Sequence, residues 1–305
     1  MTIRIKQFAM DRSIVAPCIY KTEPHRVTDW GFVVSRDIYA ELEEMLGLYS
    51  AYNFIPGRHH YRIDAYFDQE KLWILEINAA FVDGWGTALN LARSCNISAN
   101  VESDYFPTTF STEDGAYLPE LKLFVSELTR RDGIPRKTIT CPENLSKLPA
   151  TTYLYGRNRP ADPFNIEPLC QEKLDNKNWL ARFSRLWEGQ KVCLPIHYEA
   201  HKTTWDNVPE DIVLKFVEKD GPASQIARQS VIFGKPKGKA RFLRTCYENG
   251  DLLAQQRIQP YRHLGYNTQI VILAVGNHVV TGYVQLSDKL VINDNSIHGP
   301  ILFDK

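Results

Sequence analysis

The feature that most constrains the fold of this chain is a pair of alternating runs joined by a polar turn. Residues 61–78 (YRIDAYFDQEKLWILEIN) hold two runs in which apolar and polar side chains alternate, on either side of the tetrapeptide DQEK. Such a pattern predicts a β-hairpin. An antiparallel register that places Asp64 opposite Glu76 also places Arg62 opposite Asn78, and side chains two residues apart share a strand face. We therefore expect these four polar groups on one face of the hairpin.

The two facing carboxylates, Asp64 and Glu76, need a partner of opposite charge. Like charges directly opposite each other on neighbouring strands destabilise a sheet unless a cation lies between them or one group is protonated. Two carboxylates and the amide carbonyl of Asn78 are hard oxygen ligands, which suit Mg²⁺ when water and substrate phosphates complete its coordination. The hairpin thus predicts a magnesium site, and an ordinary solvent-facing hairpin is the simpler interpretation of the same pattern.

The other face of the second strand carries Trp73, Leu75 and Ile77. Because these side chains are apolar and alternate with the polar ones, we expect them to face the core. The polar face would then rest on a rigid sheet.

The remainder of the chain predicts a mixture of helices and strands. Helical spacing of apolar residues after a polar cap indicates an amphipathic helix over residues 35–49, and a Gly-Trp-Gly sequence separates the hairpin from a shorter helix. Further helices and strands alternate between residues 108 and 198, which favours an α/β layer with parallel strands, whereas the last hundred residues are mostly β. Helices are expected at 35–49, 87–93, 118–131 and 171–187, and strands at 61–67, 72–78, 137–140, 151–155, 191–195, 212–217, 241–247, 252–259, 268–275 and 278–286, before a short closing segment at 290–303. A Gly/Lys-rich loop between strands at 233–239 is interpreted as a solvated turn, with a direct phosphate contact as the alternative.

Composition excludes several classes of function. The 305 residues include 36 Lys plus Arg and 36 Asp plus Glu, evenly spread, so no basic stripe is present to attract nucleic acid. The charged first residues do not form a signal peptide and no apolar run is long enough to cross a bilayer, so we expect a cytoplasmic protein without membrane contact. The 6 cysteines are widely separated, which favours buried thiols over a zinc site or a disulfide framework. The oligomeric state stays open, a homodimer included.

The late part of the chain offers candidate nucleotide contacts. Lys215 lies in an otherwise apolar strand, where its charged head must find an anion or reach solvent. An edge strand facing water is the plainer explanation. Lys202 is a weaker candidate of the same kind. Gln255 and Gln256 place amides near the end of an apolar strand, a chemistry that suits the edge of an adenine.

In this order, these pieces resemble the permuted ATP-grasp ligases, typified by the synthetase domain of glutathionylspermidine synthetase and, more remotely, by eukaryotic glutathione synthetase. In that family the metal-binding strands come early in the chain, and the phosphate lysine and adenine hinge come late. Arg62-Ile-Asp64 and Glu76-Ile-Asn78 are similar to the R-x-D and E-x-N elements of the family, with the same twelve-residue step between the carboxylates. The resemblance implies that Asp64, Glu76 and Asn78 hold Mg²⁺ and that Arg62 binds the reacting carboxylate and its acyl phosphate.

The resemblance also implies which residues contact ATP. The family covers the phosphates with a glycine-rich loop, whereas residues 218–228 offer a single glycine, so polar side chains of this segment are expected to substitute. Residues 293–303 are similar to the closing N-x-S…P…F segment of the family. The expected nucleotide contacts are Lys202, Lys215, Ser224, Gln225, Arg228, Gln255, Gln256, Ile258 and Asn293.

The resemblance implies an α/β (α+β), ATP-grasp-like fold. Its expected parts are a region at 1–107 with the metal-binding hairpin, an α/β layer at 108–198 similar to the pre-ATP-grasp region, and a nucleotide-binding β region at 199–305, packed as one ligase unit. The implied activity is ATP- and Mg²⁺-dependent ligation of a small-molecule carboxylate to an amine, amino-acid or peptide-like, through an acyl phosphate.

Other functions remain open at this point. One is a degenerate ATP-grasp kinase or nucleotide-binding protein, and another is a noncatalytic partner-binding protein. A hydrolase that uses Asp64 and Glu76 as acid and base is disfavoured, because facing strand positions lie only about 5 Å apart at Cβ. The residues do not identify the carboxylate, the amine or the pathway.

Overall fold

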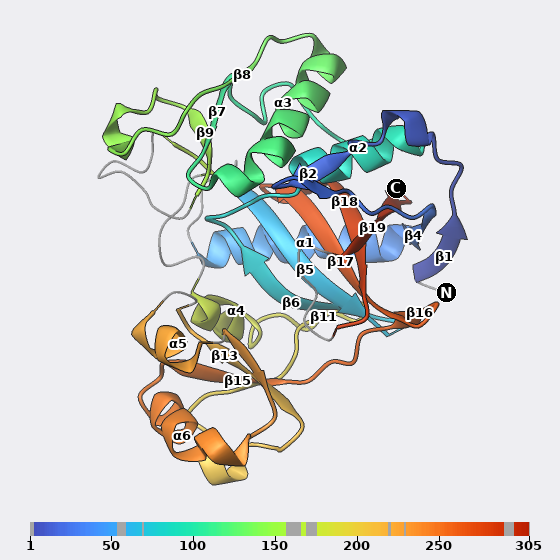
Figure 1. Ribbon diagram of the computed structural model, residues 1–305. Coiled ribbons are helices and arrows are strands. Elements are labelled where there is room, and N and C mark those ends of the chain that lie inside the picture. The colour runs from blue at the N-terminus through green and yellow to red at the C-terminus, as the bar shows by residue number, and fades with distance from the viewer. Residues whose placement is uncertain are drawn as a thin grey trace.

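The central element of the protein is a large mixed sheet whose strands come from both ends of the chain (Figure 1). The computed structural model describes residues 3–53, 59–68, 70–156, 166–168, 176–218, 221–228, 230–289 and 296–304. In these ranges the sheet has nine strands, and β16 pairs with β17 beside the main path. In spatial order the strands of the main path are β1 (Ile3–Gln7), β4 (Trp30–Val34), β19 (Ile297–Phe303), β18 (His278–Ser287), β17 (Tyr266–Val275), β5 (His60–Phe67), β6 (Leu72–Asn78) and β11 (Val192–Cys193), with β16 at Arg262–His263.

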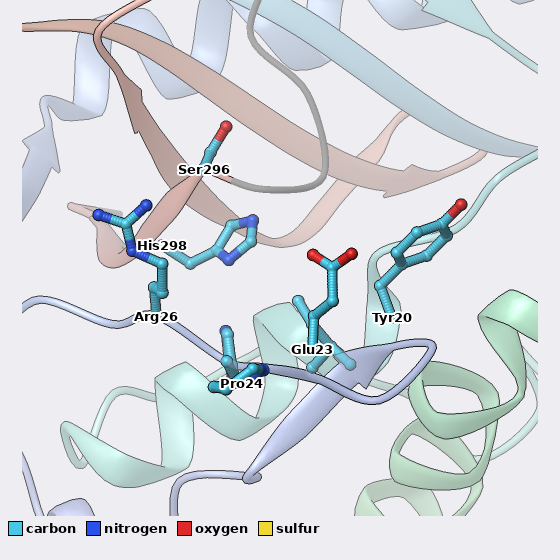
Figure 2. A pocket seen from close by; sticks show the side chains of 8 residues that line it. Tyr20, Glu23, Pro24, Arg26, Ser296 and His298 are labelled. Atoms are coloured by element: carbon cyan, nitrogen blue, oxygen red, sulfur yellow. The ribbon is translucent and has the colours of Figure 1, made fainter.

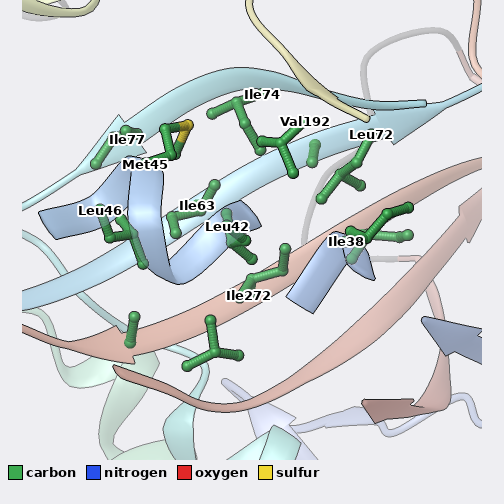
Figure 3. Close-up of a cluster of buried hydrophobic side chains, with 14 of the residues drawn as sticks. Ile38, Leu42, Met45, Leu46, Ile63, Leu72, Ile74, Ile77, Val192 and Ile272 are labelled. Carbon is green, nitrogen blue, oxygen red and sulfur yellow. The ribbon is translucent and has the colours of Figure 1, made fainter. Parts of the chain in front are cut away.

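Helix α1 (Arg36–Tyr52) covers one face of this sheet. Its buried side chains recur at helical spacing, so they form one stripe that packs on the sheet. Figure 3 shows Ile38, Leu42, Met45 and Leu46 of this stripe beside Ile63 of β5, Ile74 of β6 and Ile272 of β17. The stripe consists of Ile38, Leu42, Met45, Leu46 and Tyr49.

A second layer packs on the opposite face. It contains helix α2 (Trp85–Ser94), helix α3 (Leu118–Asp132) and a small parallel sheet, and Figure 1 shows this layer above the central sheet. The indole of Trp85 stacks on Phe124 at 5.8 Å between ring centroids and donates its N–H to the Tyr153 hydroxyl at 2.9 Å. The parallel sheet has the order β10 (Ile166–Glu167), β9 (Thr152–Tyr155), β7 (Thr109–Thr112) and β8 (Lys137–Thr138).

Helices α2 and α3 approach each other closely at Gly86. The buried carboxylate of Glu120 accepts the backbone N–H groups of Gly86 and Thr87, so it caps the first turn of α2. A side chain at Gly86 would meet backbone atoms of α3, because a Cβ there would lie 2.5 Å from the Glu120 carbonyl oxygen and 2.6 Å from the Phe124 nitrogen. Glycine is therefore required by packing at this position.

A third group of elements lies at the other end of the molecule, below the large sheet in Figure 1. Its antiparallel sheet carries helices α5 (Pro222–Ala227) and α6 (Ala240–Glu248), and helix α4 (Lys177–Phe183) lies between it and the large sheet. The strand order is β12 (His197–Tyr198), β15 (Leu252–Gln256), β13 (Ile212–Phe216) and β14 (Val231–Phe233). A separate hairpin, β2 (Cys18–Tyr20) with β3 (Glu23–Pro24), packs through β2 against α3.

The predicted mixed α/β class is confirmed, as are the parallel pairing in the middle of the chain and the hairpin around Gly276. The strand expected at residues 241–247 is wrong, because these residues lie in α6. Leu243, Cys246 and Tyr247 are its buried residues, and their spacing of three and four positions is helical. The loop at 233–239 accordingly leads into a helix rather than into a strand. Within the described ranges, no helix is long and apolar enough to cross a membrane.

Gly86→Ala should destabilise the protein by about 1–3 kcal/mol, since the new methyl group meets backbone atoms that cannot rotate away. Helix propensity alone would favour alanine by about 1 kcal/mol. Urea denaturation measures the difference. Gly115→Ala is the matched control, because a Cβ there meets no atom within 4 Å. Equal stability of the two variants would contradict the close contact of α2 with α3.

Candidate functional site

The polar face of the β5–β6 hairpin has the predicted register. Asp64 lies opposite Glu76 and Arg62 opposite Asn78, in antiparallel pairing. Beyond Asp64 the register shifts, so that Ala65 pairs with Ile74 and Leu75 is the extra residue of a β-bulge.

Because of this bulge, the side chains of β6 that face the core differ from those predicted. Leu72, Ile74 and Ile77 are buried, whereas Trp73 and Leu75 are only half-buried. The indole N–H of Trp73 instead binds the carboxylate of Asp68 at 2.7 Å. The strict alternation used for the prediction fails here, because one inserted residue moves every side chain before it to the other face.

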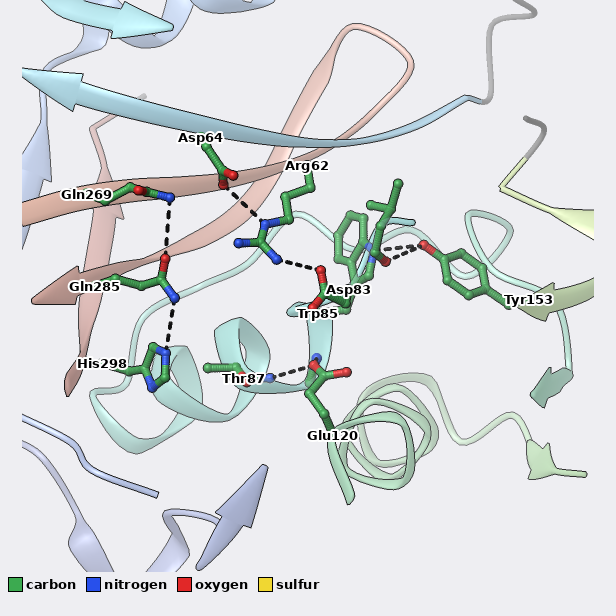
Figure 4. Close-up of polar contacts among 12 residues, drawn as sticks. Arg62, Asp64, Asp83, Trp85, Thr87, Glu120, Tyr153, Gln269, Gln285 and His298 are labelled. Carbon is green, nitrogen blue, oxygen red and sulfur yellow. Dashed lines mark hydrogen bonds and ion pairs between the residues drawn. The ribbon is translucent and has the colours of Figure 1, made fainter. Parts of the chain in front are cut away.

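Arg62 forms ion pairs with two carboxylates, those of Asp64 and Asp83 (Figure 4). Its Nε donates to Asp64 at 3.1 Å and its Nη1 donates to Asp83 at 2.5 Å, and the three side chains are 16%, 18% and 8% exposed. Burial opposes the charge of Arg62, but the two carboxylates outweigh burial and hold the pKa of its guanidinium well above the usual value. The sequence prediction missed Asp83, whose only signal was a lone acidic residue after the apolar run that follows β6.

The carboxyl group of Asp64 is in an unfavourable place for a negative charge. Burial raises its pKa, Arg62 lowers it, and the neighbouring Glu76 raises it again, so that the pKa lies above the usual value. A further cation beside Asp64 and Glu76 would therefore stabilise the ionised pair.

Two lysines from distant parts of the chain reach this pair. Lys177, the first residue of α4, forms an ion pair with Glu76. Lys215 of β13 is 8% exposed, and its Nζ donates to the carbonyl oxygen of Leu75 at 2.9 Å. Because Leu75 is the bulged residue, its backbone is released from the β5 ladder and can accept this bond. The prediction singled out Lys215 and missed Lys177, since a lysine at the start of a short helix carries no distinctive signal.

The surroundings of Lys215 disfavour the charged form of its amine. Burial lowers its pKa to about 8, while Glu76 raises the value and Lys177 lowers it. His197 of β12 lies in the same surroundings, where burial and then the charge of Lys215 lower its pKa to about 3. His197 is therefore neutral at pH 7, with its Nδ1 3.2 Å from the Ser184 hydroxyl. The sequence offered no reason to select it.

These groups line one small cavity between the large sheet and the antiparallel sheet. Its volume of ≈ 10 Å³ is about that of one water probe. Gln255 of β15 also lines it and is 2% exposed, and its Nε2 has no hydrogen-bond partner among the described residues. A buried amide donor without a partner is costly, so this donor is suited to a ligand. The polar lining consists of Glu76, Asn176, Lys177, His197, Lys215 and Gln255.

Other residues predicted to bind ATP lie outside this lining. Lys202 is exposed in the turn after Glu199, and Gln256 uses its side-chain carbonyl to accept the N–H of Ile196 at 3.2 Å. Ile258 is half-buried beyond the end of β15. In α5 the Ser224 hydroxyl donates to the Gly221 carbonyl at 2.9 Å, Gln225 is exposed, and Arg228 is an exposed cap with φ 54°. Asn293 lies outside the described residues.

The oxygen donors of Asp64, Glu76 and Asn78 suit magnesium, which takes part of its coordination shell from water and phosphate. Within the described ranges, no three His, Cys, Asp or Glu side chains are grouped so that they could hold a metal ion. Mg²⁺ commonly takes only one or two carboxylates and completes its shell with water and phosphate oxygens. Asp64 and Glu76 with the amide of Asn78 match that need, and the ion pair of Lys177 with Glu76 marks a place where a cation is stabilised.

Comparisons with known proteins give little guidance. No family model matches the chain, and no curated protein sequence matches it. Among solved structures, one similar chain is the crystal structure of a "putative gamma-glutamylcysteine synthetase" from Methylobacillus flagellatus KT. It has 11% sequence identity and a TM-score of 0.47, over 87% of this chain and 82% of that chain. A similarity at this level shows neither the family nor the function of this chain.

Lys215→Met should stabilise the protein at pH 7, because it removes a buried charge whose desolvation opposes folding. The folded-state pKa of Lys215 lies near 8 and the usual value is 10.5, so the unfolded state holds the extra proton between these pH values. The stability of the wild type should therefore rise relative to the variant from pH 8 to pH 10.5, by roughly 3 kcal/mol at about 1.4 kcal/mol per pKa unit.

Chemical denaturation across this pH range measures the difference. Lys122→Met, at an exposed position of α3, is the control and should show no such window. A pH-independent difference between the wild type and Lys215→Met would contradict the burial of the charged amine.

Proposed function

We propose that this chain is an ATP- and magnesium-dependent carboxylate–amine ligase of the permuted ATP-grasp type. The observation that carries the proposal is the opposed pair Asp64 and Glu76, with the buried cation of Lys215 bound one residue from Glu76. Excess acidic groups on one side and buried cationic groups on the other suit a metal-bound polyphosphate, which needs both.

In this proposal Asp64, Glu76 and Asn78 would hold magnesium, which when bound neutralises phosphate oxygens during phosphoryl transfer. Lys215 would place its ammonium against the same phosphates, where burial strengthens the attraction. The unpartnered Nε2 of Gln255 would donate to the adenine edge. Lys202, Ser224, Gln225, Arg228, Gln256, Ile258 and Asn293 remain proposed nucleotide contacts from the resemblance alone.

Arg62 would orient the reacting carboxylate. Its Nε and Nη1 bind Asp64 and Asp83, which fixes the plane of the guanidinium. In the described part of the chain this leaves its Nη2 donors for a substrate carboxylate. The carboxylate would attack the γ-phosphorus of ATP to give an acyl phosphate and ADP, and an amine would then displace phosphate to form the amide. The chain supplies alignment and charge stabilisation and no nucleophile of its own.

Lys177 already neutralises one of the proposed metal ligands. Its ion pair occupies Glu76, so this carboxylate could hold magnesium only once the ammonium group of Lys177 has moved away from it. The displaced lysine would remain beside the cavity, where it could bind a phosphate oxygen. This exchange keeps the local charge balanced with and without ligand.

Glu76→Ala should lower ADP release by at least about 100-fold, because it removes a carboxylate ligand of the metal. The assay measures ADP from Mg-ATP in the presence of mixed amino acids as carboxylate and amine donors. Glu44→Ala, on the exposed side of α1, is the control and should retain the wild-type rate. Wild-type ADP release by Glu76→Ala would contradict the assignment of the metal site.

Hydroxylamine separates ligation from the alternative kinase activity. A ligase that forms an acyl phosphate yields a hydroxamate when hydroxylamine replaces the amine. A stable phosphorylated product without hydroxamate would instead support the kinase alternative.

Arg62→Lys should reduce kcat/KM by about 10-fold or more although the charge is kept, because lysine cannot bind Asp64, Asp83 and a carboxylate with one planar fork. The kinetic assay is again ADP release. An unchanged kcat/KM would show that Arg62 serves only the structure.

A further inference from the structure

A second cavity lies between the β2–β3 hairpin and strand β19 (Figure 2). Its volume is ≈ 340 Å³, which falls within the range of small-molecule sites. Its lining includes Tyr20, Glu23, His25, Arg26, Ser296 and His298, and none of the residues proposed above for the metal or ATP. This cavity is therefore separate from the proposed metal and ATP site.

The wall of the cavity is held by backbone hydrogen bonds. The N–H of Thr28 donates to the His298 carbonyl at 2.9 Å, and the N–H of His298 donates to the Arg26 carbonyl at 2.9 Å. The N–H of Lys21 donates to the Ala116 carbonyl at 2.8 Å, which ties the hairpin to the second layer. The spacing of Glu23, His25 and Arg26 around His298 is thus set by the fold.

His298 offers a buried hydrogen-bond donor. Its ring is 3% exposed, and its Nε2 lies 3.4 Å from the amide nitrogen of Gln285, which can only donate. The carbonyl oxygen of Gln285 accepts in turn from Gln269 at 3.4 Å, as Figure 4 shows. Burial, then the charges of His25 and Arg62, lower the pKa of His298 to about 3, so the ring is neutral at pH 7. Because its Nε2 accepts from Gln285, the single ring proton is on Nδ1. This Nδ1 has no partner among the described residues.

His25 offers the complementary acceptor. Its Nδ1 lies 3.2 Å from the Ala16 carbonyl and must donate to it, since a carbonyl can only accept. Burial lowers the pKa of His25 to about 4, so its Nε2 keeps a free lone pair at pH 7. Within the described part of the chain this atom is also buried without a partner. The centroids of the two rings are 5.2 Å apart and both residues line the cavity, so one small ligand can reach both rings.

Two opposite charges complete the site. Arg26 and Glu23 lie on opposite sides of the His298 imidazole in Figure 2. Both are exposed, so they lie at the rim and can meet a ligand without having to be desolvated in advance. A metal ion does not fit, because no grouping of three metal-binding side chains occurs in the described ranges.

We propose that this cavity binds the zwitterionic head of a free α-amino acid. The carboxylate lies against the Nδ1–H of His298 and the guanidinium of Arg26, and the ammonium group lies against the Nε2 of His25 and the carboxylate of Glu23. Each ligand charge thus meets one buried polar atom and one rim charge of opposite sign. Monovalent amines or carboxylates satisfy only half of these groups.

The cavity opens on the same sheet face as the proposed ligase site. The register pairs Asp64 with Val271, Val271 with Tyr283, and Gln285 with His298, so their side chains share one face. His298 lies three strands and two residue positions from Asp64, about 16 Å at the usual strand spacing and rise. That the amino acid is a ligase substrate rests on the proposed function, whereas its binding does not.

The test is isothermal titration without nucleotide or magnesium. The twenty common L-amino acids are titrated singly, and the tightest is compared with its deaminated acid and its decarboxylated amine. We expect saturable binding of at least one amino acid, weakened about 10-fold or more in both analogues. No saturable binding, or equal binding of an analogue, would overturn the proposal.

Rim variants test the assignment without disturbing buried groups. Glu23→Gln and Arg26→Gln should each weaken binding about 10-fold or more, whereas the controls Glu44→Gln and Arg36→Gln, on exposed positions of α1, should bind as the wild type. Wild-type affinity in both rim variants would place the ligand elsewhere and overturn the proposal. Amino acid binding without ADP release would uphold it while the proposed ligase function fails, and ADP release without amino acid binding would do the reverse.

Nitrogen-15 NMR of the imidazoles tests the hydrogen-bond roles. Both His25 and His298 should be neutral at pH 7 with the proton on Nδ1. A proton on Nε2 of His298 would reverse its role and contradict the proposed carboxylate contact.

Discussion

The repulsion between Asp64 and Glu76 is the constraint on which the rest of the site depends. Their register on adjacent strands places two acids face to face in a partly buried setting, and three cationic side chains lie around them. Arg62 comes from the same hairpin, Lys177 from α4, and Lys215 from the antiparallel sheet. The carboxylate pair thus links three parts of the fold electrostatically.

Polar groups continue from this pair across the large sheet. Tyr283 packs beside Arg62 and Asp83 and contacts His298 at 5.4 Å between ring centroids, and Gln285 adjoins them in the next register position. A buried row of polar groups is stable only where each group is hydrogen-bonded. Polar atoms without a partner among the described residues, near its two ends, therefore mark places where a ligand could bind. Gln255 lies near one end and His298 at the other, and both line cavities.

The hairpin and its register were predictable because strict alternation and a short polar turn leave few registers open. The bulge at Leu75 was not, since an inserted residue leaves the composition of the strand unchanged. The strand predicted at 241–247 is part of a helix, which the spacing of its buried residues at 243, 246 and 247 indicates. Asp83, Lys177 and His197 reach the site only through tertiary contacts, and no local pattern marks such residues.

Thermal stability with and without Mg-ATP tests the central claim most directly. A ligand that binds only the folded state stabilises it by roughly 2.7 kcal/mol at a hundredfold excess over Kd. The account predicts a shift that requires magnesium in the wild type and disappears in Glu76→Ala. The absence of any shift with Mg-ATP or Mg-ADP in the wild type, or a full shift in Glu76→Ala, would contradict a metal-nucleotide site at the carboxylate pair.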